Sequence, residues 1–188
     1  MSIESLIDEN GVLRLPEDVV LPGNLTYKLV TLGNNCFNCL HSLIELYIPA
    51  SVQNIEWSFW KCYNLRRFVV DDNNPKYSSI DGVLYSKDQE LVAYPNAHGK
   101  EYSVVDGTIE VSHLAFKSCK DIEIIKLPAS LRKIGDNAFY GCASLKRVFL
   151  PDGIKNIGCA TENSRYKFKY HYKGLDYSHI ELLDLLQE

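Results

Sequence analysis

The side chains that could carry chemistry in this sequence are first of all its six cysteines. Cys36 and Cys39 form a Cys-x-x-Cys pair, which is the spacing of a zinc half-site or of a redox-active dithiol. A structural zinc site needs about four ligands, and the sequence contains no second pair with this spacing. We therefore predict that the two cysteines bind no metal.

Histidines are the next candidates, because they serve as acids, bases and ligands near neutral pH. None stands in a Ser/His/Asp or Cys/His signature, and no glycine-rich phosphate-binding motif occurs. The sequence thus predicts a non-catalytic protein with no cofactor. An enzymatic alternative stays open, because catalytic groups can converge from distant positions. It would require polar groups gathered around His98 or His113, in a pocket beside an inserted hairpin. The five histidines are His41, His98, His113, His171 and His179.

The remaining cysteines recur with the period of a repeat that organises the chain. The segment LPASLRKIGDNAFYGCASLKRVFLP begins and ends on Leu-Pro, and 23 residues separate Pro128 from Pro151. The unit L-P-x-x-L-x-x-I-G-x-x-A-F-x-x-C-x-x-L-x-x-V recurs along the chain, and repeats of 20 to 50 residues indicate a stacked architecture. Its Ile-Gly position is occupied by Leu32-Gly33, Ile55-Glu56, Val111-Ser112, Ile134-Gly135 and Ile157-Gly158.

One interval between these positions is longer than the others and predicts an insertion. From Ile55 to Val111 the distance is 56 residues, or two periods plus ten. The excess falls near 71–104, where 83–85 and 91–94 are strand-like around a polar turn. We expect a β-hairpin insertion there. A further strand near Tyr102 to Val105 would have to bridge the strands on either side of it.

The repeated units resemble those of BspA-like bacterial leucine-rich repeats, whose pattern is I-P-x-S-V-x-x-I-G-x-x-A-F-x-x-C-x-x-L. IPASVQNIEWSFWKCYNL and LPASLRKIGDNAFYGCASL are close matches, and the run from Asn73 to Tyr85 is similar to another pattern of that family. The resemblance covers Leu13 to Gly158 and implies a leucine-rich repeat solenoid. It also implies an adhesin-type alternative, because larger relatives bind host matrix proteins. Glu56 and Ser112 stand in place of glycine and Val105 in place of proline, and we expect irregular turns there. Cys39 stands one place before the usual cysteine position.

Elementary packing leads to the same α/β fold, with one strand and one short helical turn in each repeat of about 23 residues. Such a unit cannot bury its apolar side alone, so neighbouring units stack into a solenoid. Cys62, Cys119 and Cys142 share one repeat position and should form a column of buried thiols. The predicted inward residues are Leu43, Leu46, Ile48, Leu65, Phe68, Val70, Ile122, Ile125, Leu127, Leu145, Val148 and Leu150.

The chain is predicted to be a single domain with a cap at each end. We expect an N-terminal cap and partial first repeat over 1–24, repeats over 25–158, and a C-terminal strand-helix cap over 159–188. In RYKFKYHYK, residues 165–173, basic and aromatic side chains alternate, so a strand there has one face of each kind. Ile180, Leu183 and Leu186 then share a helical face. The aromatic face should cover the last repeat, which favours a cap over a nucleic-acid-binding ribbon.

Charge and hydropathy exclude several classes of function. A net charge of −4 and a pI of about 5.7 argue against a protein that binds nucleic acid through its overall field. The first residues do not form a secretory signal, and no segment is long enough to span a membrane. We therefore expect a cytoplasmic location without membrane contact, where the cysteines stay reduced.

The surface that could bind is the solvent-facing side of the strands. Exposed aromatic residues beside arginine are typical of interface hot spots, and the basic strand or the hairpin could also contribute. The leading hypothesis is a protein-interaction module with a protein partner, for example an immunity protein that neutralises a toxin. The predicted partner-binding residues are Tyr47, Arg66, Arg67, Lys146, Arg147 and Phe149.

Overall fold

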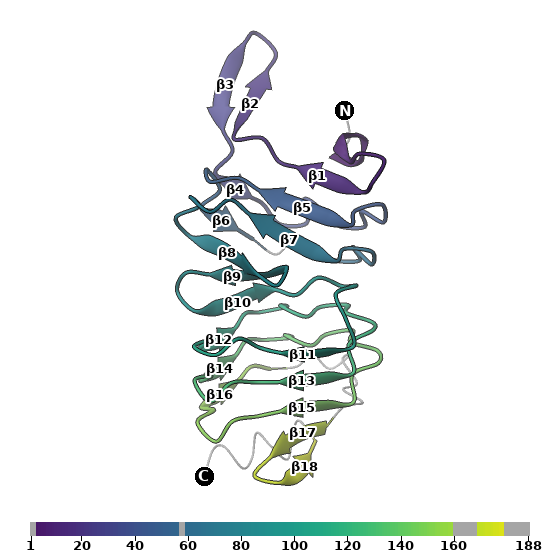
Figure 1. The fold of residues 1–188 in the computed structure, drawn as a ribbon, viewed down its shortest axis with the longest axis vertical. Coiled ribbons are helices and arrows are strands. Elements are labelled where there is room, and N and C mark those ends of the chain that lie inside the picture. The colour runs from purple at the N-terminus through teal and green to yellow at the C-terminus, as the bar shows by residue number, and fades with distance from the viewer. Residues whose placement is uncertain (1–2, 57–58, 160–168, 179–188) are drawn as a thin grey trace.

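A computed structural model describes residues 3–56, 59–159 and 169–178, and it shows an elongated β-solenoid (Figure 1). Strands of three or four residues form one wall of the solenoid, which we call the strand face. It consists of one parallel sheet in the order β1-β5-β7 and a second sheet in the order β11-β13-β15-β17-β18. Their bounds are β1 Val12–Arg14, β5 Glu45–Ile48, β7 Arg67–Val70, β11 Glu101–Ser103, β13 Ile124–Lys126, β15 Arg147–Phe149, β17 Lys169–Tyr172 and β18 Leu175–Tyr177.

The other wall, which we call the back wall, combines two-residue strands with the four-residue strands β8, β9 and β10. It too is divided, into the pair β4-β6 and a six-stranded sheet in the order β16-β14-β12-β10-β9-β8. Near the N-terminus a 3-10 helix, η1, spans Ile3–Leu6, and the hairpin of β2 and β3 projects from the solenoid (Figure 1). The bounds are β2 Asp18–Leu21, β3 Leu25–Lys28, β4 Thr31–Leu32, β6 Asn54–Ile55, β8 Tyr77–Ile80, β9 Val83–Ser86, β10 Glu90–Ala93, β12 Glu110–Val111, β14 Lys133–Ile134 and β16 Asn156–Ile157.

Strand register reproduces the period found in the sequence. Ile124 lies opposite Arg147, 23 residues further on, and Val111 lies opposite Ile134 at the same separation. Equivalent side chains therefore stack in rows along each wall. The predicted inward residues are buried, except that Leu127 is half-buried. This confirms the inward face that the apolar spacing predicts.

The predicted hairpin is present, and it is larger than expected. β9 and β10 pair antiparallel, and a third strand, β8, pairs with β9 on its other side. β10 also serves as a repeat strand, because Leu91 lies opposite Val111 in a parallel pair. Leu91 thus occupies the Ile-Gly position of an additional repeat, which lies between Ile55 and Val111 and was not recognised in the sequence.

The short helical turn predicted for each repeat is not found in the described residues, and the α/β fold class is corrected to a β-solenoid. Asn35 and Cys39 have φ of 62° and 63°, and Leu114 and Ser118 have φ of 60° and 63°. Left-handed residues four positions apart leave room for only one tight turn between them, since a right-handed helix needs continuous negative φ. The turns stack instead: the Phe116 amide donates to the Ala138 carbonyl of the next repeat at 2.8 Å.

At the C-terminal end the predicted inward aromatic face is found at Tyr170 and Tyr172, which are 1% and 4% exposed. β17 pairs in parallel with β15, and β18 returns antiparallel to it. Residues 165–168 and the helix expected within 180–186 lie outside the described residues, so nothing supports a helical cap. None of the described helical segments has the length and apolar character of a membrane span.

Candidate functional site

The insertion separates the six predicted binding residues into two groups, and Arg66 and Lys146 lie just before β7 and β15. Tyr47 and Arg67 lie on the sheet of β1, β5 and β7, whereas Arg147 and Phe149 lie on the sheet that begins at β11. In the part of the chain that the structure describes, no strand joins β7 to β11, so the expected bridging strand near 102–105 is found as β11 but does not bridge. The single binding surface predicted from the sequence becomes two.

The first strand patch consists of Arg14, Glu45, Tyr47, Arg67 and Val69. Tyr47 lies between Arg14 and Val69 in the sheet register, and the Arg14 guanidinium carbon lies 3.6 Å from the centre of the Tyr47 ring. The Arg67 guanidinium forms an ion pair with Glu45, whose side chain is 7% exposed. This hydrogen bond raises the pKa of Arg67. The patch therefore offers a half-exposed aromatic ring in contact with one cation, Arg14, and a second cation, Arg67, that is held by a carboxylate.

The second strand patch consists of Lys126, Arg147, Phe149, His171 and Asp176. Sheet register places Lys126, Phe149 and His171 side by side on three neighbouring strands. The Phe149 and His171 ring centres are 4.9 Å apart. Asp176 Oδ2 accepts a hydrogen bond from Arg147 Nη2 at 2.8 Å, and Asp176 Oδ1 lies 2.9 Å from His171 Nδ1. One carboxylate thus positions two basic side chains around a half-exposed ring.

Carboxylates offset much of the positive charge that the sequence suggests for this surface. His171 and then Arg147 lower the pKa of Asp176 through their hydrogen bonds. Glu123, between β11 and β15, forms ion pairs with both Lys146 and Lys100, and their hydrogen bonds lower its pKa. Lys146 and Arg147 are therefore paired, and a partner would meet a mixed surface rather than a cationic one.

A cleft of about 780 Å³ lies where the strand face is interrupted between β7 and β11. His98, one of the two histidines of the enzymatic alternative, lines it, and its Nδ1 lies 2.9 Å from the Arg66 carbonyl oxygen. The predicted site residues Arg66 and Arg67 line the cleft as well, together with Asp81 and Asp121. The cleft therefore combines charges of both signs.

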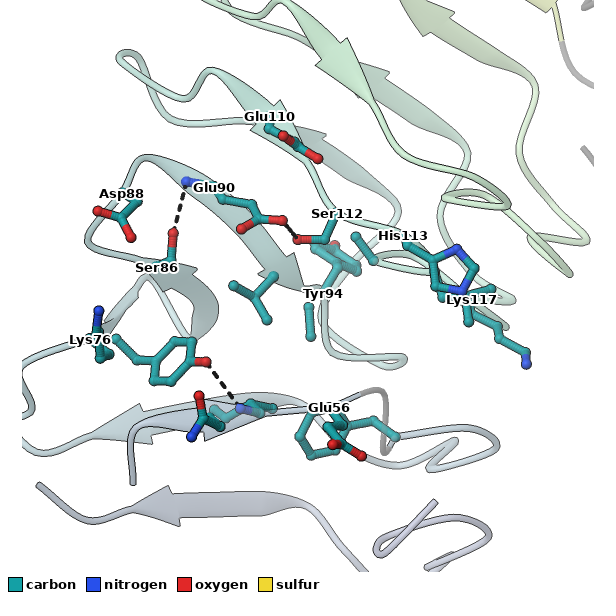
Figure 2. A pocket seen from close by; sticks show the side chains of 18 of the residues that line it. Glu56, Lys76, Ser86, Asp88, Glu90, Tyr94, Glu110, Ser112, His113 and Lys117 are labelled. Atoms are coloured by element: carbon teal, nitrogen blue, oxygen red, sulfur yellow. Dashed lines mark hydrogen bonds between the residues drawn. The ribbon is translucent and has the colours of Figure 1, made fainter. Parts of the chain in front are cut away.

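A second depression, which we call the back groove, has a volume of about 520 Å³ and separates β6 from β10 (Figure 2). His113, the other histidine of that alternative, lies at one end of it beside Ser112. The Ser112 hydroxyl donates a hydrogen bond to Glu90 Oε1, and the His113 ring points away from it (Figure 2). Polar groups do gather near His113, but Ser112 is bound to a carboxylate and not to the imidazole.

The predicted column of buried thiols is confirmed at Cys62 and Cys119, and its geometry explains its chemistry. Cys62 and Cys119 are buried and Cys142 is half-buried, whereas Cys36 and Cys39 are exposed. The Cys62 thiol donates to the Phe37 carbonyl of the preceding repeat at 2.8 Å, and the Cys142 thiol donates to the Phe116 carbonyl at 3.0 Å. Burial raises the pKa of both Cys62 and Cys142 to about 12. Thiols held in this way pack as small apolar groups.

Among the described residues no group of three or more histidines, cysteines and carboxylates is placed to hold a metal ion.

Sequence reasoning missed two residues that shape the back groove. Tyr94 takes the place of the repeat phenylalanine: its ring stacks on Phe116 at 4.9 Å and its carbonyl accepts from the Cys119 thiol. Tyr77 caps an edge strand, because its hydroxyl accepts a hydrogen bond from the Ile55 amide at 3.0 Å. Tyr94 could have been found from the sequence, because it precedes the repeat phenylalanine Phe116 by 22 residues, which is close to one period.

Comparison with known proteins identifies the repeat and places it among bacterial structures. The family model for BspA type leucine rich repeat regions, with six copies, matches residues 21–86 and 93–169. No curated protein matches the chain. A leucine-rich repeat protein from Eubacterium ventriosum is similar, with a TM-score of 0.68 and 28% identity over 86% of this chain and 43% of the other.

Two further solved structures show the same architecture. The pneumococcal vaccine antigen PcpA has a TM-score of 0.54 and 26% identity, over 69% of this chain and 38% of the antigen. A leucine rich cell surface protein from Faecalibacterium prausnitzii has a TM-score of 0.53 and 21% identity, over 82% of this chain and 52% of that one, and shows the fold alone. The chain thus spans less than half the length of the first two proteins.

Proposed function

The chain belongs to the BspA-type leucine-rich repeat family, and from that premise we propose that it is a non-catalytic module that binds a protein partner on its strand face. Leucine-rich repeat domains are generally protein-interaction scaffolds, since stacked repeats create extended surfaces. The observation that carries the proposal is the row of Lys126, Phe149 and His171 in the second strand patch. Arginine and aromatic side chains dominate binding energy at interfaces.

Preorganisation supports the second strand patch in particular. Arg147 and His171 are both held by Asp176, so binding does not have to immobilise these two side chains, and less entropy is lost on association. Phe149 is half-exposed between them, which leaves apolar surface available for burial by a partner. The first strand patch repeats the arrangement on a smaller scale, with Tyr47 beside Arg14.

Two kinds of partner follow from the sequence, and we place the immunity role first. In this role the protein would neutralise a toxin in the cytoplasm, a proposal that rests on its length of 188 residues, its net charge of −4 and the cytoplasmic location expected from the sequence. In the alternative role, which rests on resemblance to larger adhesins, it would bind a host matrix protein at the cell surface. Both roles use the same patch and differ in the partner recovered.

Site-specific photo-crosslinking tests the proposal. A benzoylphenylalanine placed at exposed Lys126 should crosslink one protein from a lysate or from a matrix extract, and mass spectrometry identifies it. The same probe at exposed Asn156, on the back wall, should not crosslink it. The double change Arg147→Glu and Phe149→Ala should abolish the crosslink, whereas Lys155→Glu should leave it intact. A partner retained equally by both variants would refute the strand-face site.

A further inference from the structure

We propose that the back groove binds a second ligand: an extended basic segment of a partner protein, which adds as a strand to the free edge of β6. The two sides of the groove come from β6 and β10, which belong to successive repeats but do not pair with each other. This site is independent of the strand patches, because the groove is lined by the back wall and by the insertion (Figure 2).

The open strand edge is the first step of the argument. From β10 to β16 of the back wall, each repeat accepts a backbone hydrogen bond from the next repeat. The Gly135 amide donates to the Val111 carbonyl at 2.7 Å, and the Ser112 amide donates to the Leu91 carbonyl at 3.0 Å. Ile55 is the equivalent residue of β6. Among the described residues β6 pairs with β4 alone, because β10 pairs with β9 in place of β6.

A side chain occupies part of the missing strand's place. The Ile55 amide donates to the Tyr77 hydroxyl at 3.0 Å, which satisfies one backbone group and leaves the rest of this edge beside the groove. Unpaired strand edges are templates for added strands, and extended peptides bind other proteins in this way. A ligand strand could therefore restore the regular pairing of the back wall.

Charge selects the kind of segment. Four carboxylates and two lysines line the groove. Glu110 is paired with Lys133 at 2.7 Å. Among the described residues Asp88 and Glu90 form no ion pair, although the charge of Glu90 also acts on Lys133. Figure 2 shows Asp88 and Glu90 on one wall and Glu56 on the opposite one. Basic side chains would be attracted from both sides. The acidic residues are Glu56, Asp88, Glu90 and Glu110, and the basic ones are Lys76 and Lys117.

Apolar residues select the alternate positions of the same segment. Along one side of the groove, Val92 and Ala93 of β10 are half-buried and buried, and Tyr94, which follows the strand, is buried. Because successive side chains of a strand point to opposite sides, a bound strand would present every second residue to these apolar groups. The residues between them would reach the carboxylates. An alternation of small apolar and basic residues therefore fits the groove.

Peptide binding tests the charge and the register together. Fluorescence anisotropy would compare labelled Val-Lys-Val-Lys-Val-Lys with Val-Glu-Val-Glu-Val-Glu on the full chain at low ionic strength. We expect saturable binding of the basic peptide alone, weakened by about tenfold in Asp88→Asn/Glu90→Gln because two charge-assisted contacts are lost. Glu101→Gln, a matched change of an exposed carboxylate on the strand face, should leave the affinity unchanged. Equal affinity for both peptides, or for both variants, would overturn the proposal.

Backbone methylation tests the strand addition separately. Two versions of the basic peptide would carry N-methyl groups on alternate amides, so that each version blocks one edge of the strand. Only the version blocked on the edge that faces β6 should lose binding. If both versions bind as the unmethylated peptide does, no strand is added and the proposal fails. Asp88→Asn alone, at an exposed position, provides a variant whose folding does not depend on the Glu90 contact with Ser112. Thermal unfolding would confirm that each variant is folded.

Discussion

Leu84 and Tyr85 are consecutive residues of β9 and lie in different hydrophobic cores. Leu84 packs with the N-terminal repeats around Leu46 and Phe68, whereas Tyr85 packs with the C-terminal repeats around Phe116. Successive strand side chains point to opposite sides, so β9 forms a two-faced partition inside the solenoid. The insertion is therefore the element through which the two halves of the molecule stabilise each other, rather than a surface decoration.

Leu84→Ala should destabilise the N-terminal half more than the C-terminal half. Leu84 is fully buried, and removing such a side chain costs about 2–5 kcal/mol of the free energy of unfolding. Hydrogen exchange should show the larger loss of protection over β5 and β7. Ile80→Ala, in the neighbouring strand and 37% exposed, is the matched control and should change little. Equal loss of protection in both halves would mean that the solenoid unfolds as one unit.

The hydroxyls of Tyr85 and Tyr102 form a polar link between the insertion and β11 of the strand face. Their oxygens are 2.7 Å apart, and burial raises the pKa of both tyrosines. Either Tyr→Phe change alone should cost about 1–3 kcal/mol, because it leaves the other hydroxyl without its partner. The double change should cost less than the sum of the single ones. Chemical denaturation of the four proteins measures this, and additive effects would show that the pair is not coupled.

Gly135 and Gly33 occupy the same repeat position and should respond in opposite ways to substitution by alanine. A Cβ at Gly135 would lie 2.4 Å from the His113 amide nitrogen of the preceding repeat, whereas nothing lies within 4 Å of one at Gly33. Gly135→Ala should therefore be strongly destabilising. Gly33→Ala should be neutral or stabilising by about 0.4–1 kcal/mol, through the reduced entropy of the unfolded chain. Thermal unfolding separates the two, and similar effects would contradict the close-approach explanation.

Much of this architecture is predictable from the sequence, because a fixed period with fixed apolar positions leaves one way to stack the strands. The rows that contain Leu46, Phe68 and Val148 follow directly from that period. The helical turns were predicted wrongly because apolar spacing does not reveal left-handed residues such as Leu114, which has φ of 60°. A glycine, which adopts positive φ without steric cost, would have marked such a site more clearly.

The division of the candidate site was not predictable for a different reason. Spacing places Arg67 and Arg147 at equivalent positions and predicts an insertion between them. It cannot show that this insertion breaks the sheet in two. The pairing of Arg147 with Asp176 also crosses a turn whose geometry depends on β18. Asp176 lies outside the repeats, so the repeat motif does not predict which side chain it will contact.

Alkaline pH should destabilise the protein through its buried thiols. The ordinary thiol pKa of 9.0 is raised to about 12 for both Cys62 and Cys142. Above pH 9 the unfolded chain releases these protons and the folded protein retains them, so stability is present below this pH and falls as pH rises toward 12. The decline is at most about 1.4 kcal/mol per pH unit for each thiol. Urea denaturation across this range should show a shallower decline for Cys62→Ala than for Cys159→Ala, where the thiol is exposed.

Asn74 should be among the residues whose substitution is most costly, because its side chain joins the insertion to the repeat before it. Asn74 is fully buried, and its amide nitrogen donates to the carbonyls of Pro49 and Val52 at 2.8 and 2.9 Å. Its amide oxygen accepts from the backbone amides of Lys76 and Tyr77 at 2.9 and 2.8 Å. All four hydrogen-bonding positions of the side chain are therefore used.

Asn74→Asp tests this role with almost no change of shape. The aspartate would place a carboxylate oxygen against two carbonyl oxygens, so we expect a loss of several kcal/mol in the free energy of unfolding at neutral pH. Part of this loss should be recovered at acid pH, because protonation restores one donor, and the Asn74→Asp protein should therefore be relatively more stable at pH 4 than at pH 7. Asn73→Asp, at the exposed neighbouring position, supplies the control for added charge. If the two substitutions lower the unfolding temperature equally, the buried amide does not hold the insertion in place.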